Sequence, residues 1–228
     1  MELRDRLALA LDVDDLVLAQ RLARHLQPWF GTVKVGLELY SAAGPEAVAS
    51  MAGAGFAVML DLKLHDIPTT VRKAARVIGA LGATYLTMHA HGGPVMLRAG
   101  VDGLRDGADA AGLPPPVPLA VTVLTSDDDA PAHILGRRVM AAAEGGCGGV
   151  VCAAADVREA KELAPRMLAV VPGIRPQLAD RHDQARAATP QQALEAGADL
   201  LVVGRPVTAA PDPAKAAAAL LESLQAPD

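Results

Sequence analysis

A short run of charged residues, Asp61-Leu62-Lys63-Leu64-His65-Asp66, has the residue types and spacing for acid–base or electrostatic chemistry. The apolar stretch 56–60 before it predicts a buried strand. Asp61 and Lys63 are two residues apart, so on a strand both side chains would point to the same face. Pro68 argues against continuation of the strand beyond Asp66. Because charge at the end of a buried strand is costly unless it is paired, we expect an ion-paired site here.

Polar residues also follow other predicted strands. In α/β folds, ligands and catalytic groups collect at the carboxyl ends of the strands. The residues at such positions are Asp12, Lys34, His89, Thr125, Ser126, Arg175, Gly204 and Arg205. Lys34 lies between Val33 and Val35 and points to the face opposite both valines, so we expect it to project inwards and to pair with Asp61. For His89, a structural role in the core and a role in the site both remain open.

Two glycine-containing segments near the C-terminus predict a phosphate site. Val171-Pro-Gly-Ile-Arg175 ends the seventh predicted strand and Val203-Gly-Arg-Pro-Val207 ends the eighth. In phosphate-binding barrels these two loops hold the anion with backbone N–H groups and the start of a short helix. Gly204 lets the backbone approach closely, Pro206 can open the helix, and Arg175 supplies a charge-assisted contact.

The elements that must position these residues alternate along the whole chain. Apolar β-type segments are followed by Ala-rich helical segments, and Asp14 or Asp15 is the expected N-cap of the first helix. The predicted strands are 7–11, 32–37, 56–62, 83–89, 118–124, 149–153, 168–172 and 199–203. The predicted helices are 14–26, 45–54, 70–81, 94–110, 131–143, 156–163, 190–196 and one that begins at Asp212-Pro213. This alternation predicts a (β/α)8 TIM barrel forming a single domain, residues 1–228. An open doubly wound sheet is the main rival, but the first turn lacks the glycines that such a fold requires.

Composition limits the classes of function. Hydrophobic residues make up 51% of the 228 residues, which excludes a disordered chain. The net charge of −5 and the lack of a basic cluster argue against a nucleic-acid partner. The apolar run 7–11 is too short for a signal peptide or a membrane span, so we expect a cytoplasmic protein with no membrane contact. Cys147 and Cys152 fit neither a metal site nor a redox motif and are expected to be buried thiols.

Several motifs between residues 7 and 208 resemble, in order and spacing, those of orotidine 5'-phosphate decarboxylases of the bacterial type. They are Leu9-Ala-Leu-Asp12, Lys34-Val-Gly36, Asp61-Leu-Lys-Leu-His-Asp-Ile-Pro68, Thr122-Val-Leu-Thr-Ser126, Pro172-Gly-Ile-Arg-Pro176 and Val203-Gly-Arg-Pro-Val-Thr208. D-x-K-x-x-D alone also occurs in related barrels such as hexulose-phosphate synthases, but the longer motif joined to G-R-P-V-T is far more specific. The resemblance implies decarboxylation of orotidine 5'-monophosphate to UMP in pyrimidine synthesis, without a cofactor or a metal.

The resemblance also implies a role for each matching residue at the reacting end of the substrate. Lys63 would deliver a proton to C6 of the pyrimidine as carbon dioxide leaves, and Asp61 would face the substrate carboxylate. Lys34 would pair with Asp61 and with a ribose hydroxyl, and Asp12 would hold the ribose. Lys34, Asp61, Lys63 and Asp66 sum to zero charge, so we expect this array to be buried without a counter-ion.

At the other end of the substrate, the resemblance implies that Thr125 meets the pyrimidine edge. The phosphate would be held by Arg175, Gln184, Gly204 and Arg205. The loop between Arg175 and Gln184 departs from the family, because it lacks the glycine expected soon after Pro176. Members of the family are dimers, which implies a homodimer with shared sites. In it, Asp66 would reach the site of the neighbouring subunit, with Ile67 and Thr70 beside it.

Two other functions compete with this interpretation. One is another phosphosugar enzyme of the same superfamily, an aldolase or epimerase that uses a metal ion. Such an enzyme needs additional carboxylate or histidine ligands at the strand ends, and this sequence has few to spare. The other is a non-catalytic nucleotide-binding barrel, which has no need for a neutral array of four charges.

Overall fold

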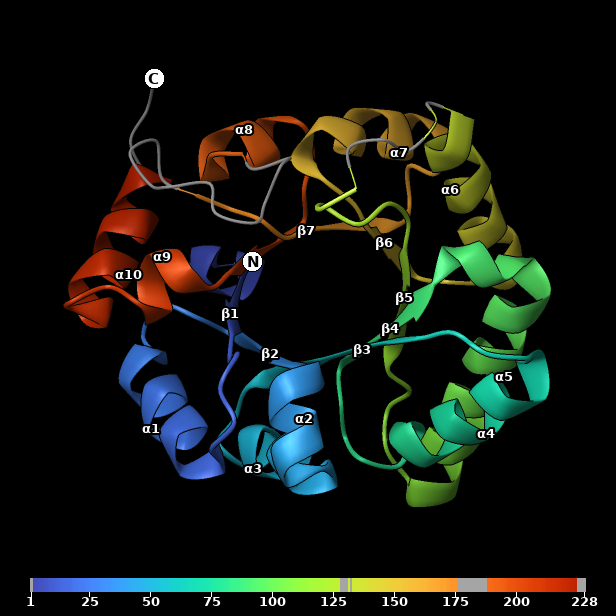
Figure 1. The fold of residues 1–228 in the computed structure, drawn as a ribbon, viewed down its shortest axis with the longest axis horizontal. Coiled ribbons are helices and arrows are strands. Elements are labelled where there is room, and N and C mark those ends of the chain that lie inside the picture. Colours follow the sequence, from blue (N-terminus) through green and yellow to red (C-terminus); the bar gives the residue numbers. More distant parts are fainter. Residues whose placement is uncertain (1, 128–130, 132, 176–187, 225–228) are drawn as a thin grey trace.

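Eight parallel β-strands close into a barrel in chain order, and β8 pairs with β1. The computed structural model describes residues 2–127, 131, 133–175 and 188–224. The strands are β1 (Leu7–Ala10), β2 (Thr32–Gly36), β3 (Ala57–Leu64), β4 (Tyr85–His89), β5 (Val117–Val121), β6 (Gly149–Val151), β7 (Leu168–Val171) and β8 (Leu200–Val203). Figure 1 shows this ring with helices around its outside. The predicted TIM barrel is confirmed, and the open doubly wound sheet is excluded because the sheet closes on itself.

Helices connect the strands and cover the outside of the barrel. They are α1 (Leu16–Leu26), α2 (Leu37–Ala43), α3 (Pro45–Gly53), α4 (Pro68–Gly79), α5 (Gly93–Ala111), α6 (His133–Gly145), α7 (Val157–Leu163), α8 (Pro190–Glu195), α9 (Arg205–Thr208) and α10 (Pro213–Ser223). Three short 3-10 segments, η1 (Leu3–Arg6), η2 (Ala90–Gly92) and η3 (Ala154–Asp156), accompany them. No helix in the described ranges is both long enough and apolar enough to cross a membrane.

The sequence prediction missed α2 and extended the preceding strand to Leu37. The strand stops one residue earlier because Gly36 is the N-cap of α2 and the helix begins at Leu37. In α2 only Leu39 is buried, so residues 37–43 carry too few buried apolar positions to show a helical period. The predicted strand 118–124 is also too long, since β5 ends at Val121.

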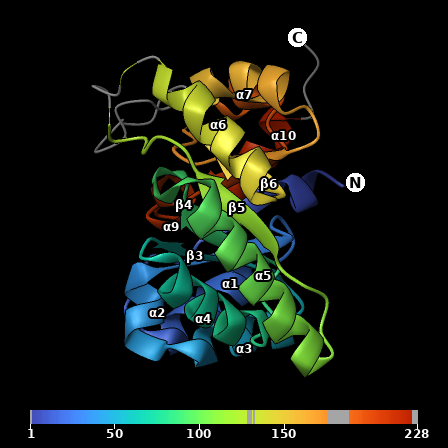
Figure 2. The same cartoon turned by 90° about the vertical axis from the view of Figure 1, so that its right-hand side faces the viewer.

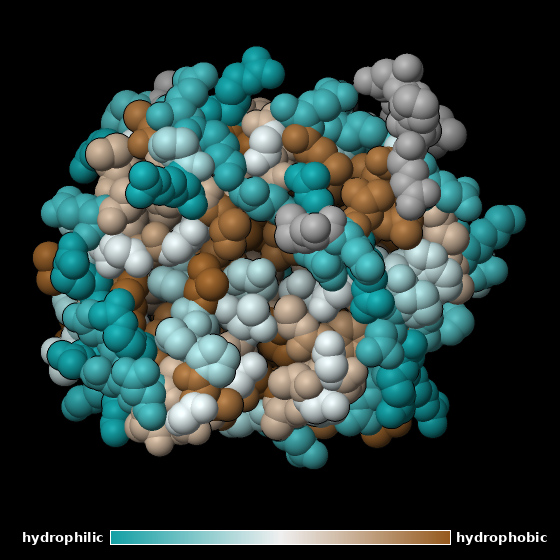
Figure 3. Space-filling model, turned by 180° about the vertical axis from the view of Figure 1, so that it is seen from behind, coloured by the Kyte–Doolittle hydropathy of each residue, from teal (hydrophilic) through white to brown (hydrophobic). Residues whose placement is uncertain are grey.

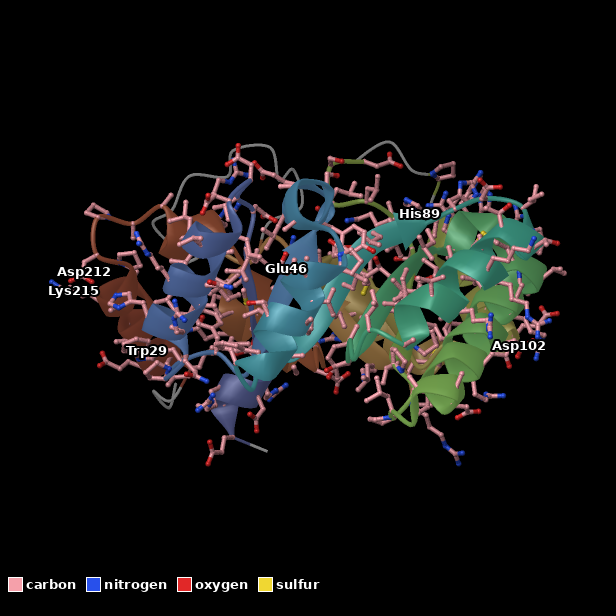
Figure 4. All side chains as sticks on the ribbon, turned by 90° about the horizontal axis from the view of Figure 1, so that it is seen from below. Trp29, Glu46, His89, Asp102, Asp212 and Lys215 are labelled. Atoms are coloured by element: carbon pink, nitrogen blue, oxygen red, sulfur yellow. The ribbon has the colours of Figure 1, made fainter. Side chains whose placement is uncertain are left out.

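Two of the helices have an aspartate N-cap whose side chain accepts a backbone hydrogen bond. Asp15 accepts a hydrogen bond from the backbone N–H of Leu18 at 2.6 Å, which confirms one of the two N-caps predicted for the first helix. Asp212 likewise accepts from the backbone N–H of Lys215 at 3.0 Å, and Figure 4 shows these two residues side by side at the start of α10. The predicted Asp212-Pro213 start of the last helix is therefore confirmed.

Strict alternation along the strands separates two apolar cores. Odd-numbered residues of β1, Leu7 and Leu9, pack between barrel and helices, whereas Ala8 and Ala10 pack inside the barrel. Inward residues on other strands complete the inner core: Met59, Leu119, Val121, Val151, Val170, Leu200 and Val202. The inner core is therefore small, and the inward positions nearer the carboxyl ends of the strands can carry the polar residues of a site.

Strand β3 carries an irregularity at the charged motif. Leu60 is level with Leu86 of β4, but Leu64 is level with Met88, so β3 has two more residues than β4 over this stretch. Within the bulge, Lys63 has a positive φ of 50°, the left-handed conformation that few non-glycine residues adopt. The expected strand end at residue 62 is therefore wrong. Asp61 and Lys63 do share one cavity, but a bulge places them there and simple alternation does not.

Helices α4 and α5 pack unusually close to one another on one side of the barrel. Figures 1 and 2 both show them side by side along their length. Gly103 and Gly107 of α5 lie directly against the backbone of α4, and a Cβ atom at either would overlap with the carbonyl oxygen of Arg72 or Arg76. The absence of a side chain at these two glycines is what permits this distance between the helices.

The two ends of the barrel differ in what covers them. In Figure 4 the carboxyl ends of the strands lie towards the upper edge, where His89 is labelled, and Trp29 lies towards the lower edge. The 3-10 segment η1 lies at the lower end, where the backbone N–H of Gly31 donates to the carbonyl of Arg4 at 2.8 Å. Figure 3 views this end, where hydrophilic residues form most of the outline and apolar residues appear in separate patches.

Both cysteine side chains are buried, as expected from the sequence. Burial raises the pKa of the Cys147 thiol to about 12, because the thiolate would lose its hydration. A thiol that stays protonated is a poor nucleophile and a poor metal ligand, so Cys147 contributes to packing.

Candidate active site

A cavity of about 240 Å³ opens at the carboxyl ends of the strands. The residues that line it come from both halves of the chain: Ala10, Asp12, Lys34, Met59, Asp61, Lys63, Val121, Val123, Leu124, Thr125, Val151, Pro172, Gly173, Arg175, Val202, Gly204 and Arg205. This end of a (β/α)8 barrel is where the active sites of such enzymes lie. The structure therefore brings most of the residues singled out in the sequence into one site.

Four charged side chains on β1, β2 and β3 form a continuous ion-paired chain. Lys34 Nζ lies 2.8 Å from Asp12 Oδ1 and 3.9 Å from Asp61 Oδ2. Lys63 Nζ lies 2.8 Å from the same Asp61 Oδ2. Two carboxylates and two ammonium groups thus alternate along the chain, and their formal charges sum to zero. This arrangement offsets the desolvation of the buried Asp61, which is only 9% exposed.

The strand register explains why Lys34 lies between two carboxylates. Lys34 is level with Ala10 on one side and with Met59 on the other. Asp12 and Asp61 are each two residues further along, a step of roughly 6.6 Å that the four-carbon arm of lysine can span. Gly36 leaves room for this arm, because a Cβ there would lie 3.0 Å from Lys34 Nζ.

The membership of this array differs from the one expected. Lys34 bonds primarily to Asp12 and only at longer range to Asp61. Asp66 is exposed, and its carboxylate accepts from the backbone N–H of Ile67 at 2.6 Å. The expectation that Asp66 reaches the site of the neighbouring subunit stays a prediction. Within one chain, Asp12 and not Asp66 completes the array of four charges. The reason is geometric, since Asp66 follows the end of β3, beyond the inward-facing positions.

Ile67 and Thr70 lie on the same exposed segment as Asp66. Ile67 is 66% exposed, which is unusual for an isoleucine, and Thr70 is exposed in the first turn of α4. None of the three lines the cavity of their own chain. The structure thus separates the D-x-K-x-x-D motif into an inward part and an outward part.

Two opposing effects act on the pKa of the Asp61 carboxylate. Burial acts to raise its pKa, but the ammonium groups of Lys63 and Lys34 and the hydrogen bonds from Lys63 and Thr87 outweigh burial. The pKa of Asp61 is consequently lowered below its ordinary value, and the carboxylate remains ionised at neutral pH. The cavity therefore presents a fixed anion held between two cations.

Residues after β5, β7 and β8 complete the cavity. Thr125 lines it together with Gly173, Gly204 and the two arginines, Arg175 and Arg205. Arg175 is only 7% exposed, and its Nη1 donates to the carbonyl of Ile174 at 2.9 Å. Helix α9 begins at Arg205, with Pro206 in its first turn as the sequence predicted. Gln184 lies outside the described residues.

His89 does not line the cavity and belongs to a group of three histidine rings beside it. Its ring centroid lies 5.8 Å from that of His65, which in turn lies 5.4 Å from that of His91. Burial, followed by the charges of His65, Lys63, Arg138 and His91, lowers the pKa of His89. His89 is therefore neutral at physiological pH and packs at the rim (Figure 4). In the described part of the chain, no group of three or more His, Cys, Asp or Glu residues is placed to hold a metal ion.

Sequence reasoning missed two kinds of residue in and around this site. The first is the apolar wall formed by Met59, Val121, Val151 and Val202, which the alternation of each strand could have identified as inward-facing. The second is Thr87 of β4, which is fully buried and donates from Oγ1 to Asp61 Oδ1 at 2.9 Å. A threonine in a strand gives no signal by itself that its hydroxyl contacts a charged site.

Comparison with known proteins agrees with this site. Residues 5–220 match the model of the Orotidine 5'-phosphate decarboxylase / HUMPS family. The orotidine 5'-phosphate decarboxylase of Moorella thermoacetica is 43% identical over 237 residues, which cover 99% of this chain and 94% of the relative. That of Anaeromyxobacter dehalogenans is 46% identical over 235 residues, covering 98% and 100%. The crystal structure of the Lactobacillus acidophilus decarboxylase superimposes with a TM-score of 0.82 at 36% identity, covering 97% of this chain and 100% of the other.

Proposed function

Because this chain belongs to the orotidine 5'-phosphate decarboxylase / HUMPS family, we propose that it converts orotidine 5'-monophosphate to UMP and carbon dioxide in pyrimidine biosynthesis. It is an enzyme of the carboxy-lyase class, as its relatives are. The observation that carries the proposal is the neutral, ion-paired chain from Asp12 to Lys63, which shares one cavity with Arg175 and Arg205. A dianionic phosphate and a reacting carboxylate need these two kinds of surroundings at the two ends of one site.

The proposed chemical step uses Lys63 as the proton donor and needs no cofactor or metal. The bond between C6 of the pyrimidine and its carboxylate breaks, and carbon dioxide leaves without the electron pair. That pair remains on C6, where the adjacent ammonium of Lys63 stabilises the developing negative charge and then delivers a proton. Lys63 is left as a neutral amine and regains its proton from water. Its Nζ, 2.8 Å from Asp61, is held for this role by an ion pair.

Asp61 and Lys34 set the electrostatics around the leaving carboxylate. In our proposal the substrate carboxylate binds beside the ionised Asp61 and adds one uncompensated negative charge to the array. Loss of carbon dioxide removes this charge from beside Asp61, while the ammonium groups remain in place. The pairing of Lys34 with Asp12 supports a role for both in holding the ribose hydroxyls, since each retains hydrogen-bonding capacity at the mouth of the cavity.

The remaining lining residues are proposed to hold the base and the phosphate. Thr125 offers a hydroxyl that can donate to or accept from the pyrimidine edge. The phosphate is proposed to bind to Arg175, Arg205 and Gln184. Gly204, which lies between β8 and α9, is proposed to contact it as well. Because the phosphate lies far from the reacting carbon, its binding energy would act by positioning the substrate.

We further propose that the enzyme is a cytoplasmic homodimer with shared active sites. The exposed segment that contains Asp66, Ile67 and Thr70 supports this proposal, because it lines no part of its own chain's cavity and displays a largely exposed isoleucine. In the dimer, Asp66 would enter the partner's site, where its charge joins the array, and Ile67 and Thr70 would lie beside it. No nucleic-acid or membrane partner is proposed, and UMP is the product released.

The test is the loss of orotidine 5'-monophosphate absorbance after purified protein is added in buffer with EDTA. We expect turnover without metal, whereas inhibition by EDTA would favour the metal-dependent phosphosugar enzyme. The Lys63→Ala variant should bind UMP but not turn over substrate, and near-normal activity in it would contradict the proposed mechanism. Lys215→Ala, which removes an exposed lysine on α10, is the matched control and should retain full activity. Binding of UMP by a wild-type protein without turnover would favour the non-catalytic barrel.

A further inference from the structure

Thr87 occupies a special position relative to the bulge in β3. Leu86 and Met88 of β4 are level with Leu60 and Leu64 of β3, so Thr87 alone faces the three residues from 61 to 63. The regular backbone ladder between the two strands is interrupted at this point. A side chain facing such an interruption can replace the missing backbone partners, and Thr87 is fully buried there.

The hydroxyl of Thr87 forms hydrogen bonds with two residues of the charged motif, Asp61 and Lys63. Its Oγ1 donates to Asp61 Oδ1 at 2.9 Å and accepts from the backbone N–H of Lys63 at 2.9 Å. A hydroxyl has one proton, and the carboxylate can only accept, so the direction of both bonds is fixed. Asp61 Oδ2 is the oxygen that faces the two ammonium groups, which leaves Oδ1 to Thr87.

The backbone of Lys63 requires such support. Its φ of 50° is the one positive value at a non-glycine residue in the described ranges. A conformation of this kind persists only where surrounding contacts hold it. The hydrogen bond from the Lys63 N–H to Thr87 holds the backbone at this strained residue. It thereby fixes the point from which the Lys63 side chain extends to Asp61.

We propose that Thr87 is a positioning residue for decarboxylation: its hydroxyl holds the Asp61 carboxylate and the Lys63 backbone at the separation that the reaction needs. The inference rests on the proposed function and deepens it, because it assigns a role to a residue that does not line the cavity and does not touch substrate. Other buried threonines show the contrast. The hydroxyl of Thr122, for example, donates to the backbone carbonyl of Val151 and contacts no charged group of the site.

The kinetic test compares Thr87→Val, which keeps the shape and removes the hydroxyl, with Thr87→Ser, which keeps the hydroxyl. We expect kcat of Thr87→Val to fall on the order of 100-fold, the scale of a small misplacement of a catalytic group, with little change in KM. Thr87→Ser should restore most of kcat. The matched control is Thr84→Val, directly before β4, which removes a hydroxyl that accepts from the backbone N–H of Val58 at 3.1 Å and should leave kcat unchanged.

A pH profile separates positioning from a merely structural role. The charged groups acting on Asp61 are Lys63 on its own strand and Lys34 on β2, while from β4 it receives the bond of Thr87. Removing that bond raises the pKa of Asp61, so the acidic limb of the kcat profile should move to higher pH in Thr87→Val. The limb should stay in place in Thr87→Ser and in Thr84→Val.

Each outcome bears on the inference. Unchanged kcat in Thr87→Val, or a lower kcat with an unmoved acidic limb, would overturn it. If Thr87→Val does not fold, as judged by circular dichroism, Thr87→Cys retains the volume with a weaker donor, and its kcat should fall below that of Thr87→Ser. Equal kcat in the Cys and Ser variants would overturn the inference. A wild-type protein without decarboxylase activity would instead refute the proposed function, which distinguishes the two failures.

Discussion

At the scale of single residues, the site depends on a buried carboxylate that stays ionised. Asp61 receives two ammonium groups at one oxygen and a threonine hydroxyl at the other. Every one of these contacts favours the charged form, and together they exceed the effect of burial. The charges of the site are thus already arranged in the absence of a ligand. Folding of the surrounding strands provides the free energy that keeps them in place.

The pH dependence of stability follows from the same contacts. A carboxyl whose folded pKa lies below its ordinary value of 3.8 stabilises the fold above that pH, and this contribution disappears as the pH falls through the folded value. We expect Asp61→Asn to reduce the free energy of unfolding by about 2 kcal/mol at neutral pH, the scale of hydrogen bonds to charged groups. The difference from wild type should shrink below pH 3.8. Urea unfolding of both proteins across pH measures it.

The control for this prediction is a carboxylate with an equally short but exposed ion pair. Asp106 lies 2.8 Å from Arg72, and both side chains are about half exposed. Because water screens such a pair, Asp106→Asn should change stability much less than Asp61→Asn does. An equal loss in both variants would show that burial of Asp61 has no special effect.

Arg175 allows a second prediction at this scale, on substrate binding. Its buried guanidinium lines the end of the cavity that we propose for the phosphate, away from the bond that breaks in the proposed reaction. Arg175→Ala should raise KM on the order of 10- to 100-fold and leave kcat within a few-fold, since it removes binding that ground and transition states share. Steady-state kinetics measures this, with the exposed Arg137→Ala as control. An unchanged KM would argue against the phosphate assignment.

At the scale of elements, β3 and the helix pair after it determine how the motif is presented. The bulge in β3 turns Lys63 towards Asp61, and the strand then ends, so that Asp66 emerges on the outside. Helix α4 starts directly afterwards at Pro68 and is held against α5 through Gly103 and Gly107. The position of α4 therefore fixes where the exposed segment with Asp66 lies.

Substitution of a packed glycine tests this helix pair. Gly107→Ala would force a methyl group into the carbonyl oxygen of Arg76, and backbone atoms cannot move aside as a flexible side chain can. We expect a loss of about 2 kcal/mol in the free energy of unfolding, the typical effect of overpacking. Gly53→Ala in α3 is the control, because no atom lies within 4 Å of its added Cβ. It should be neutral or slightly stabilising, as alanine favours helices. Equal effects in chemical denaturation would contradict the packing argument.

At the scale of the whole molecule, closure of the barrel brings the charges of β1 to β3 and the loops after β7 and β8 into one cavity. Under the proposed function, residues from the two ends of the chain would thereby act on one substrate. Asp66 faces outward with Ile67 and Thr70, so the cavity of one chain contains Asp61 and Lys63 of the motif but not its third charged residue. Under the proposed dimer, the partner supplies that residue.

Mixed dimers test this sharing. Co-expression of Lys63→Ala and Asp66→Asn, each inactive alone, should produce hybrid dimers with one intact site. With random pairing, half of the dimers are hybrids, so activity should return to about a quarter of wild type. Two differently tagged chains allow the hybrid to be purified and assayed. No recovery in the purified hybrid would show that Asp66 does not act across the dimer.

Much of this architecture could be predicted from the sequence. The eight strands and the inward direction of Lys34 follow from the alternation of apolar residues, which depends on local geometry alone. The strand-end positions of Asp12, Asp61, Arg175 and Arg205 predict that these residues line one site, and the structure places them there. Helix α2 could not be predicted, because a short segment with one buried residue has no period to detect.

The sequence by itself thus determined the barrel, the end of it that carries chemistry, and the residue types available there. Only the tertiary structure decided that Lys34 pairs more closely with Asp12 than with Asp61, that a bulge brings Lys63 to Asp61, and that Thr87 bonds to both Asp61 and Lys63. The physical reason is that alternation along a strand fixes the face of a side chain. Its partners depend on the register between neighbouring strands, which is set by the packing of the whole barrel.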